Sequence, residues 1–314
     1  MNTPRHEQGS PTGGRILVIR GGAIGDFILT LPAIAALRRQ FPETHLEVLG
    51  YPHIVQLALA GGLVDRVESI EARAMAGFFA RHGDLAENLA DYFSEFDLII
   101  SYLYDPDGIF RTNIARCSPA QFIQGPHRPD EAAGIPASQV YLKPLERLAI
   151  FGADPVPRLS IQGRPARVRS IALHPGSGST QKNWPEGRWS ELVGHIMDQT
   201  DRDLLLVGGE AEGERLQRLS AALPPARVRV AQSLPLAELA RLLERCGGYV
   251  GHDSGISHLA SALGLPGLVL WGHTVEAVWR PPADRIRILR APGGLATLRP
   301  TVVFEHLQQL IQTD

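Results

Sequence analysis

The stretch Arg15-Ile-Leu-Val-Ile-Arg20-Gly-Gly-Ala-Ile-Gly25-Asp26 decides the fold of this chain. Its first half is a short apolar run that ends at glycines, which is typical of a buried strand. Behind the glycines, residues 31–41 carry apolar side chains at helical spacing and include two arginines near their end, so they predict a helix. A strand, a glycine-rich loop and a helix in this order begin a βαβ unit, which predicts a parallel sheet.

The same alternation of strands and helices continues through the chain. In the first half, strands are expected at 45–50, 67–70 and 97–102, and helices at 54–60, 85–93 and 140–151. Residues 155–165 are rich in proline and glycine, which is typical of a linker. Behind them, strands are expected at 170–174, 203–207, 228–230, 249–250 and 268–270.

We therefore predict an α/β protein with two Rossmann-like, doubly wound domains and a cleft between them. The expected divisions are a disordered tail over residues 1–14, an N-terminal domain over 15–160, a C-terminal domain over 161–300, and a last helix over 301–314. We expect that last helix to pack back toward the N-terminal domain.

Composition excludes several classes of protein. With 314 residues, 44% of them hydrophobic, the chain is too apolar to be disordered. A net charge of −2 gives no general basic surface, so no nucleic-acid partner is expected. Cys117 and Cys246 are too few for a disulfide framework, and no apolar run approaches the ~20 residues of a membrane span. A cytoplasmic protein is expected.

Ligands of open parallel sheets bind beyond the carboxyl ends of the strands, so the loops after the strands are the places to examine. In the first of these loops, Gly22 and Gly25 let backbone N–H groups approach an anion or a substrate. As a dinucleotide fingerprint the loop is weak. From the pattern alone, Asp26 is more readily a helix N-terminal carboxylate than a functional group.

Three loops of the second half also suit a phosphate or a nucleotide. After residues 170–174 come Ser177, Ser179, Thr180 and Lys182, which fit a phosphate cradle or an ordinary helix-capping loop. After residues 203–207, Gly208 and Gly209 precede Glu210 and Glu212, which suit ribose hydroxyls or a helix start. Ser254 and Gly255 follow residues 249–250 at a helix N-terminus, which again suits phosphate.

Two other interpretations of the last loop are weaker. Asp253, Ser254 and His258 lie within six positions, a spacing that does not predict hydrolase-triad geometry. His252, Asp253 and His258 match no helical metal-ligand spacing, so a metal site is a minor alternative. Three anion-friendly loops in one domain describe a nucleotide-diphosphate site without an obligatory metal or cofactor.

In this order, the loops resemble those of the heptosyltransferase family (glycosyltransferase family 9). The resemblance rests on four stretches that span nearly the whole chain. They are residues 19–34 around Gly-Asp26, His174-Pro-Gly with Lys182-Asn-Trp184-Pro, Gly208-Gly-Glu210, and Asp253-Ser-Gly-Ile-Ser-His258 with the residues up to Gly264.

The resemblance implies a GT-B fold and an inverting, metal-independent transfer of a sugar, heptose or a related one, from an ADP-sugar. The N-terminal domain would bind a lipid-linked or core oligosaccharide acceptor of lipopolysaccharide type, at the inner membrane face. Asp26 would be the general base and Lys182 would balance the charge of the leaving diphosphate. The remaining roles would be phosphate binding by Ser177, Ser179, Thr180, Ser254 and Gly255, loop support by Asp253 and His258, and ribose binding by Glu210 or Glu212.

Two alternatives stay open at this point. One is a nucleotide-binding Rossmann oxidoreductase or epimerase, against which the missing Gly-x-Gly-x-x-Gly pattern speaks. The other is a non-catalytic nucleotide- or glycan-binding module, which would need neither Asp26 as a base nor Lys182 as a cation.

Overall fold

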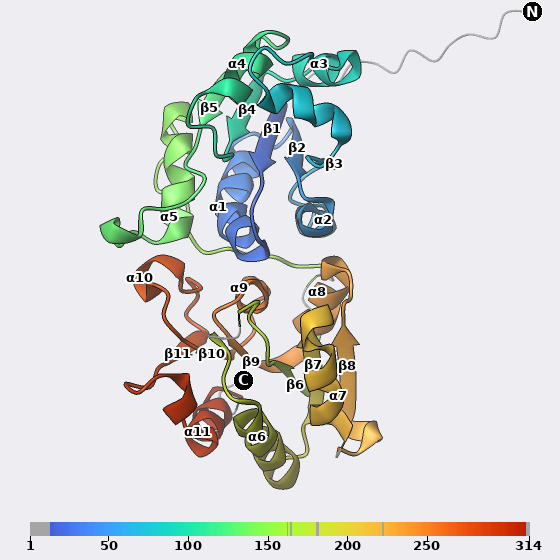
Figure 1. Ribbon diagram of the computed structural model, residues 1–314, viewed down its shortest axis with the longest axis vertical. Helices are drawn as coiled ribbons and strands as arrows, with labels where there is room; N and C mark the ends of the chain where they lie inside the picture. The colour runs from blue at the N-terminus through green and yellow to red at the C-terminus, as the bar shows by residue number, and fades with distance from the viewer. Residues whose placement is uncertain (1–12, 162, 164, 180–181, 222, 312–314) are drawn as a thin grey trace, which may run out of the picture.

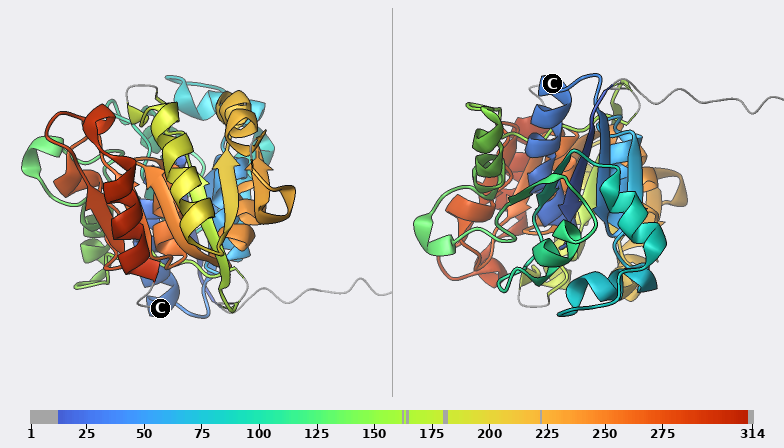
Figure 2. Two further views of the ribbon diagram at one scale, coloured as in Figure 1. Left: turned by 90° about the horizontal axis from the view of Figure 1, so that it is seen from below. Right: turned by 90° about the horizontal axis from the view of Figure 1, so that it is seen from above.

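The computed structural model describes residues 13–161, 163, 165–179, 182–221 and 223–311. The described residues form two parallel sheets, one in each half of the chain (Figure 1). The first has the strand order β3-β2-β1-β4-β5, and the second has the order β11-β10-β9-β6-β7-β8. Figure 2 shows each half from its outer end, with helices packed over the sheets. The prediction of two Rossmann-like α/β units is confirmed.

We refer to the part around the first sheet as the N-terminal domain. Its strands are β1 (Arg15–Arg20), β2 (His45–Gly50), β3 (Arg66–Ser69), β4 (Leu98–Ser101) and β5 (Gln121–Gln124). Its helices are α1 (Ile24–Gln40), α2 (Pro52–Ala60), α3 (Glu87–Ser94), α4 (Ile109–Ala115) and α5 (Ala137–Leu142). Short 3-10 helices are η1 (Arg73–Phe79), η2 (Glu131–Ala133) and η3 (Lys143–Leu148).

The part around the second sheet is the C-terminal domain. Its strands are β6 (Val168–His174), β7 (Asp203–Gly208), β8 (Val228–Gln232), β9 (Cys246–His252), β10 (Gly267–Leu270) and β11 (Ile286–Leu289). Its helices are α6 (Glu186–Gln199), α7 (Gly213–Ala221), α8 (Leu236–Glu244), α9 (Gly255–Ala262), α10 (Glu276–Trp279) and α11 (Pro300–Ile311). Short 3-10 helices are η5 (Glu210–Glu212), η6 (Pro225–Arg227) and η7 (Leu295–Thr297).

The two domains touch where α1 meets α9 and where α2 meets α8. The first contact is very close, because glycine stands on both sides of it. A Cβ atom added to Gly255 would lie 2.7 Å from Cβ of Ile24 and 3.0 Å from the backbone nitrogen of Gly25. One apolar cluster therefore runs without interruption from one domain into the other.

The expected position of the last helix is wrong. The buried face of α11 carries Val303, Phe304, Leu307 and Ile311, which pack with the core of the C-terminal domain. Its neighbours are α6, β9 and β10, far from the N-terminal domain in Figure 1. The apolar stripe of an amphipathic helix predicts that it is buried, and it says nothing about which sheet covers it.

Other element boundaries also differ from the prediction. Helix α1 begins at Ile24 rather than at residue 31, and it contains Pro32 in its interior. The connecting helix expected over residues 140–151 is divided into α5 and the 3-10 helix η3, which has Pro144 in its first turn. Proline lacks the N–H that would continue the α-helical bonding pattern. Strands β5 and β11 escaped prediction because both are four residues long and partly polar.

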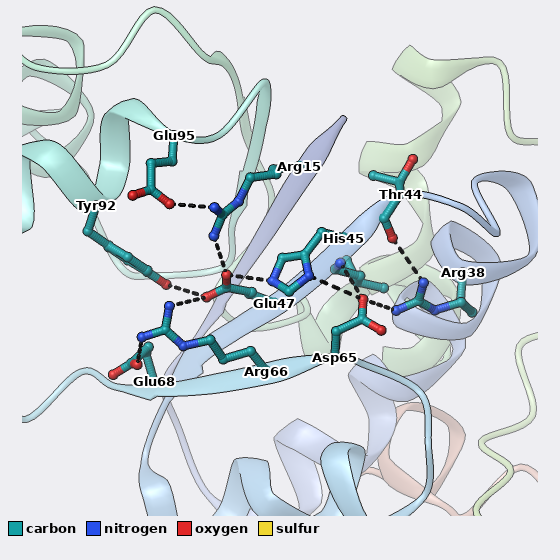
Figure 3. A network of polar contacts seen from close by, with 11 residues as sticks. Arg15, Arg38, Thr44, His45, Glu47, Asp65, Arg66, Glu68, Tyr92 and Glu95 are labelled. Atoms are coloured by element: carbon teal, nitrogen blue, oxygen red, sulfur yellow. Dashed lines mark hydrogen bonds and ion pairs between the residues drawn. The ribbon is translucent and has the colours of Figure 1, made fainter. Parts of the chain in front are cut away.

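A buried carboxylate joins three strands of the first sheet (Figure 3). Glu47 of β2 has no exposed side-chain surface, and its Oε1 lies 2.7 Å from Nη2 of Arg15 and 2.8 Å from Nε2 of His45. The hydroxyl of Tyr92 donates to Oε2 at 3.2 Å, and Nη1 of Arg66 lies 3.8 Å away. Burial raises the pKa of Tyr92 far above its usual range, so the hydroxyl stays a donor. A buried charge is tolerable only when it is paired in this way.

We expect Glu47→Ala to lower the free energy of unfolding by about 1–3 kcal/mol, because the Tyr92 hydroxyl loses its acceptor while Arg15 and Arg66 keep Glu95 and Glu68 as partners. The measurement is a urea unfolding curve beside that of Glu43→Ala, an exposed residue of the loop before β2. Equal unfolding midpoints for the two variants would contradict a stabilising role for the network.

Candidate active site between the two domains

Two adjoining cavities lie between the domains, at the carboxyl ends of the strands. The first, of about 550 Å³, is lined by Asp26 from the N-terminal domain and by Lys182 and Asp253 from the C-terminal domain. The second, of about 730 Å³, lies over the ends of β7 and β8. Their shared walls make them neighbouring parts of one cleft. The shared residues are Gly22, Ala23, Gly25, Tyr51, Ser177, Ser254 and Gly255.

Asp26 both caps its helix and faces the first cavity. It stands in the first turn of α1, where its Oδ2 accepts the backbone N–H of Ala23 at 3.1 Å. Its Oδ1 lies 3.4 Å from the hydroxyl of Tyr141 and 3.6 Å from Nη2 of Arg20. Gly22 has a φ of +100°, a left-handed backbone that glycine adopts without strain. The side chain is 26% exposed, so a substrate can reach it.

Lys182 is held from the opposite domain. Its Nζ lies 2.9 Å from Oδ2 of Asp253, which also accepts the hydroxyl of Thr274. The Asp253 side chain is almost entirely buried, whereas that of Lys182 is 29% exposed. The ammonium group is thus anchored at the cavity wall and still open to a ligand.

The predicted phosphate loops reach the cleft in part. Ser177 lines both cavities, with its Oγ 2.8 Å from the carbonyl oxygen of Ser179 and 2.7 Å from Oδ1 of Asn183. Ser179 is not among the side chains that line either cavity. Thr180 lies outside the described residues. Ser254 is the residue before α9, so with Gly255 it places a helix N-terminus at the junction of the two cavities.

All four predicted residues of the loop after β7 line the second cavity: Gly208, Gly209, Glu210 and Glu212. Glu212 is used within the loop, because its Oε2 accepts the N–H of Gly209 at 2.9 Å. Glu210 is exposed at the cavity edge. The rest of this cavity is mostly apolar, which suits the flat face of a nucleobase. Its apolar wall includes Val207, Ala231, Leu234, Leu236, Leu239 and Ile256.

Three buried histidines of the C-terminal domain are neutral at pH 7. Burial lowers the pKa of His174 to about 3, and it lowers the pKa values of His252 and His258 to about 4. Nε2 of His252 accepts the N–H of Trp184 at 2.8 Å, and its Nδ1 lies 3.1 Å from the carbonyl oxygen of Gly176. Both nitrogens of His252 are thus engaged by the protein, which leaves neither for a metal ion.

The geometry also rejects a hydrolase triad in this loop. Oγ of Ser254 lies 3.3 Å from Nδ1 of His174 rather than pairing with His258. His258 lines the first cavity, close to Gly25 of the opposite domain.

Several residues of the first cavity were not predicted from the sequence. From the N-terminal domain they are Arg20, Tyr102, Tyr104, His127 and Arg128, and from the C-terminal domain Thr274 and Trp279. Nε1 of Trp279 donates to Oε1 of Glu131 at 2.9 Å, and Arg128 lies over its ring at 5.5 Å, so the domains are also joined beside this cavity. Arg20 and Tyr102 stand at the ends of expected strands, and this was the only signal available for any of these residues.

No helix in the described ranges is both long and apolar enough to cross a membrane.

Comparisons with known proteins point to one family. The profile of glycosyltransferase family 9 (heptosyltransferase) matches residues 154–306. Lipopolysaccharide heptosyltransferase 1 of Escherichia coli K12 is 34% identical over 142 residues, which are 45% of this chain and 44% of that protein. Lipopolysaccharide heptosyltransferase 3 of the same strain is 22% identical over 300 residues, 83% of each chain. The chain thus matches less than half the length of its heptosyltransferase 1 relative.

Solved structures agree in fold. E. coli ADP-heptose lipopolysaccharide heptosyltransferase II has a TM-score of 0.77 at 19% identity, covering 95% of this chain and 99% of its own. E. coli heptosyltransferase WaaC with ADP has a TM-score of 0.73 at 20% identity, covering 94% and 99%. The GT-B fold expected from the resemblance is confirmed. Residues 154–306 thus match glycosyltransferase family 9 (heptosyltransferase), and the fold of the chain is that of solved heptosyltransferases.

Proposed function

We propose that this protein transfers heptose, with inversion, from an ADP-sugar to a lipid-linked oligosaccharide acceptor of the lipopolysaccharide core. The observation that carries the proposal is the first cavity, which Asp26 enters from one domain and Lys182 from the other. A sugar transfer that displaces a diphosphate needs a base for the acceptor hydroxyl and a positive charge for the leaving diphosphate. The carboxylate of Asp26 and the ammonium group of Lys182 offer these on opposite walls.

In the proposed reaction, an acceptor hydroxyl attacks the anomeric carbon of the donor sugar. Its proton passes to the Asp26 carboxylate as the new C–O bond forms, and the bond from the anomeric carbon to the ADP oxygen breaks. A single displacement inverts the configuration at that carbon. Lys182 and the N-terminus of α9 balance the charge that develops on ADP, so we propose that the reaction does not depend on a metal ion.

The donor would occupy both cavities. We place the adenosine in the apolar second cavity, with Glu210 near the ribose. Glu212 would fix the loop of Gly208 and Gly209 through its bond to the N–H of Gly209. The diphosphate would lie at the junction, against Ser177, Ser254 and Gly255, which belong to both walls. Support for an ADP-sugar comes from the relative WaaC, whose structures contain ADP and ADP-2-deoxy-2-fluoro heptose.

The acceptor would enter the first cavity from the N-terminal domain, past the loop of Gly22 and Gly25. Because such an acceptor is anchored in lipid, we propose that the protein works in the cytoplasm in peripheral contact with the inner membrane. Sugar hydroxyls and rings can be met there by Tyr104, His127 and Trp279, which line this cavity.

Calorimetric titration with ADP, UDP, GDP and NAD, in EDTA and then with Mg²⁺, tests the donor assignment. We expect ADP to bind in EDTA and Mg²⁺ to change its affinity little, because protein groups supply the positive charge. Preference for UDP or GDP would preserve the reaction and discard ADP-heptose as donor. Binding of NAD alone would contradict the proposal in favour of an oxidoreductase.

A further inference from the structure

We propose that Arg20 and Tyr141 are positioning residues for Asp26, which hold its carboxylate oriented for proton transfer. This inference rests on the proposed function, in which Asp26 is the base. Neither residue belongs to the loop of Gly22 and Gly25. Arg20 is the last residue of β1, and Tyr141 lies in α5.

Arg20 is a fixed charge behind the base. The residue is 3% exposed, and its Nη1 donates to the carbonyl oxygens of His127 at 2.9 Å and Tyr102 at 3.3 Å. Its Nη2 donates to the backbone carbonyl of Asp26 at 3.4 Å. One guanidinium therefore ties the start of α1 to the segments that follow β4 and β5, both of which line the first cavity.

Aromatic stacking keeps this guanidinium in place. Its central carbon lies 4.5 Å from the ring centre of Tyr141 and 5.8 Å from that of Tyr102. The hydroxyl of Tyr102 donates to the backbone carbonyl of Tyr141 at 2.7 Å, which fixes α5 against the end of β4. A cation held between rings and carbonyl groups has little freedom to leave the carboxylate.

Both residues act on the same oxygen of Asp26. Oδ1 lies 3.6 Å from Nη2 of Arg20 and 3.4 Å from the hydroxyl of Tyr141. Burial raises the pKa of Tyr141 to about 12, so its hydroxyl is a proton donor throughout the working range. A cation and a hydroxyl donor on one oxygen fix the direction in which the carboxylate faces the first cavity.

The other titratable groups of the first cavity come from both domains. His127 and Arg128 belong to the N-terminal domain, and His258, Lys182 and Asp253 belong to the C-terminal domain. Lys182 pairs with Asp253 on the far wall.

The test is kcat and KM of Tyr141→Phe and Arg20→Lys, measured on the full chain. Tyr141→Phe keeps the ring that stacks on Arg20 and removes only the hydroxyl. Without that donor the carboxylate loses one of the two groups that orient it, so kcat should fall several-fold. KM for the ADP-sugar should stay within about twofold, because neither residue lines the nucleotide cavity. Arg20→Lys keeps a charge without the fork of donors, and it should retain more activity than Arg20→Met.

Tyr92→Phe and Arg15→Lys are matched controls. They make the same chemical changes beside another buried carboxylate, Glu47, on the amino-terminal side of the first sheet. We expect them to leave kcat and KM unchanged. If Tyr141→Phe and Arg20→Lys match these controls, the positioning role is overturned while the proposed function stands.

A wild-type protein that transfers no sugar would overturn the proposed function. The pairing of Arg20 with Asp26 could then still be tested by stability measurements. Urea unfolding midpoints of Arg20→Lys, Asp26→Asn and the double variant then measure the coupling of the two side chains. Non-additive shifts support the pairing, and additive shifts overturn it.

Discussion

Asp26→Asn should lower kcat by about 10²–10⁴-fold and leave ADP binding within about twofold of the wild type. An amide cannot accept the proton of an acceptor hydroxyl, yet its oxygen can still take the N–H of Ala23 that the carboxylate holds at 3.1 Å. The helix start and the donor site should therefore survive while the chemical step is lost. Activity with ADP-heptose and a lipid-linked acceptor gives kcat, and calorimetry gives the ADP affinity.

The matched control is Asp107→Asn, an exposed aspartate of the same domain that pairs with Arg81 at 3.5 Å. It should leave both measurements unchanged. Loss of ADP binding by Asp26→Asn would assign Asp26 to the structure of the cleft. Retention of transfer at the wild-type rate would exclude it as the base.

Lys182→Ala should weaken ADP binding and lower kcat by about 10²–10³-fold. The ammonium group stands at the wall of the first cavity, where the proposal places the departing diphosphate as it gathers charge. Removing it also leaves the buried Asp253 carboxylate with Thr274 but without its cation, so the wall becomes repulsive to phosphate. The effect on kcat should exceed the effect on KM, because the charge is largest at bond breaking.

Lys143→Ala is the control, since it removes an exposed lysine of the N-terminal domain. Steady-state rates over a range of donor concentrations separate kcat from KM for both variants. An unchanged kcat for Lys182→Ala would contradict the proposal that this residue assists departure of the diphosphate.

The sequence predicted the elements whose signals are contiguous. The run from Arg15 to Asp26 combines an apolar strand, a glycine turn and a helix start in twelve consecutive residues, and the structure has them in that order. The loops around Lys182 and Ser254 were found in the same way, because each directly follows a buried strand. Local patterns suffice where one short segment carries both the fold and the site.

Residues that reach the site from distant segments could not be found in this way. Tyr141 lies 115 positions after Asp26, in a segment whose pattern predicted a helix but gave no link to the site. Trp279 meets Glu131 across 148 positions and from the other domain. These contacts depend on how the helices pack in the folded protein. The same packing determines that α11 covers the second sheet. Propensity and periodicity contain no information about these partners.

The contact of Gly255 with Ile24 and Gly25 has a mechanical consequence. It stands between the two cavities, since α9 follows the central strand β9. Thr274 and Trp279 of the first cavity lie toward β10, on one side of β9. The apolar wall of the second cavity lies toward β7 and β8, on the other side. Because Gly25 and Gly255 line both cavities, a side chain at position 255 would push the two domains apart beside both cavities at once.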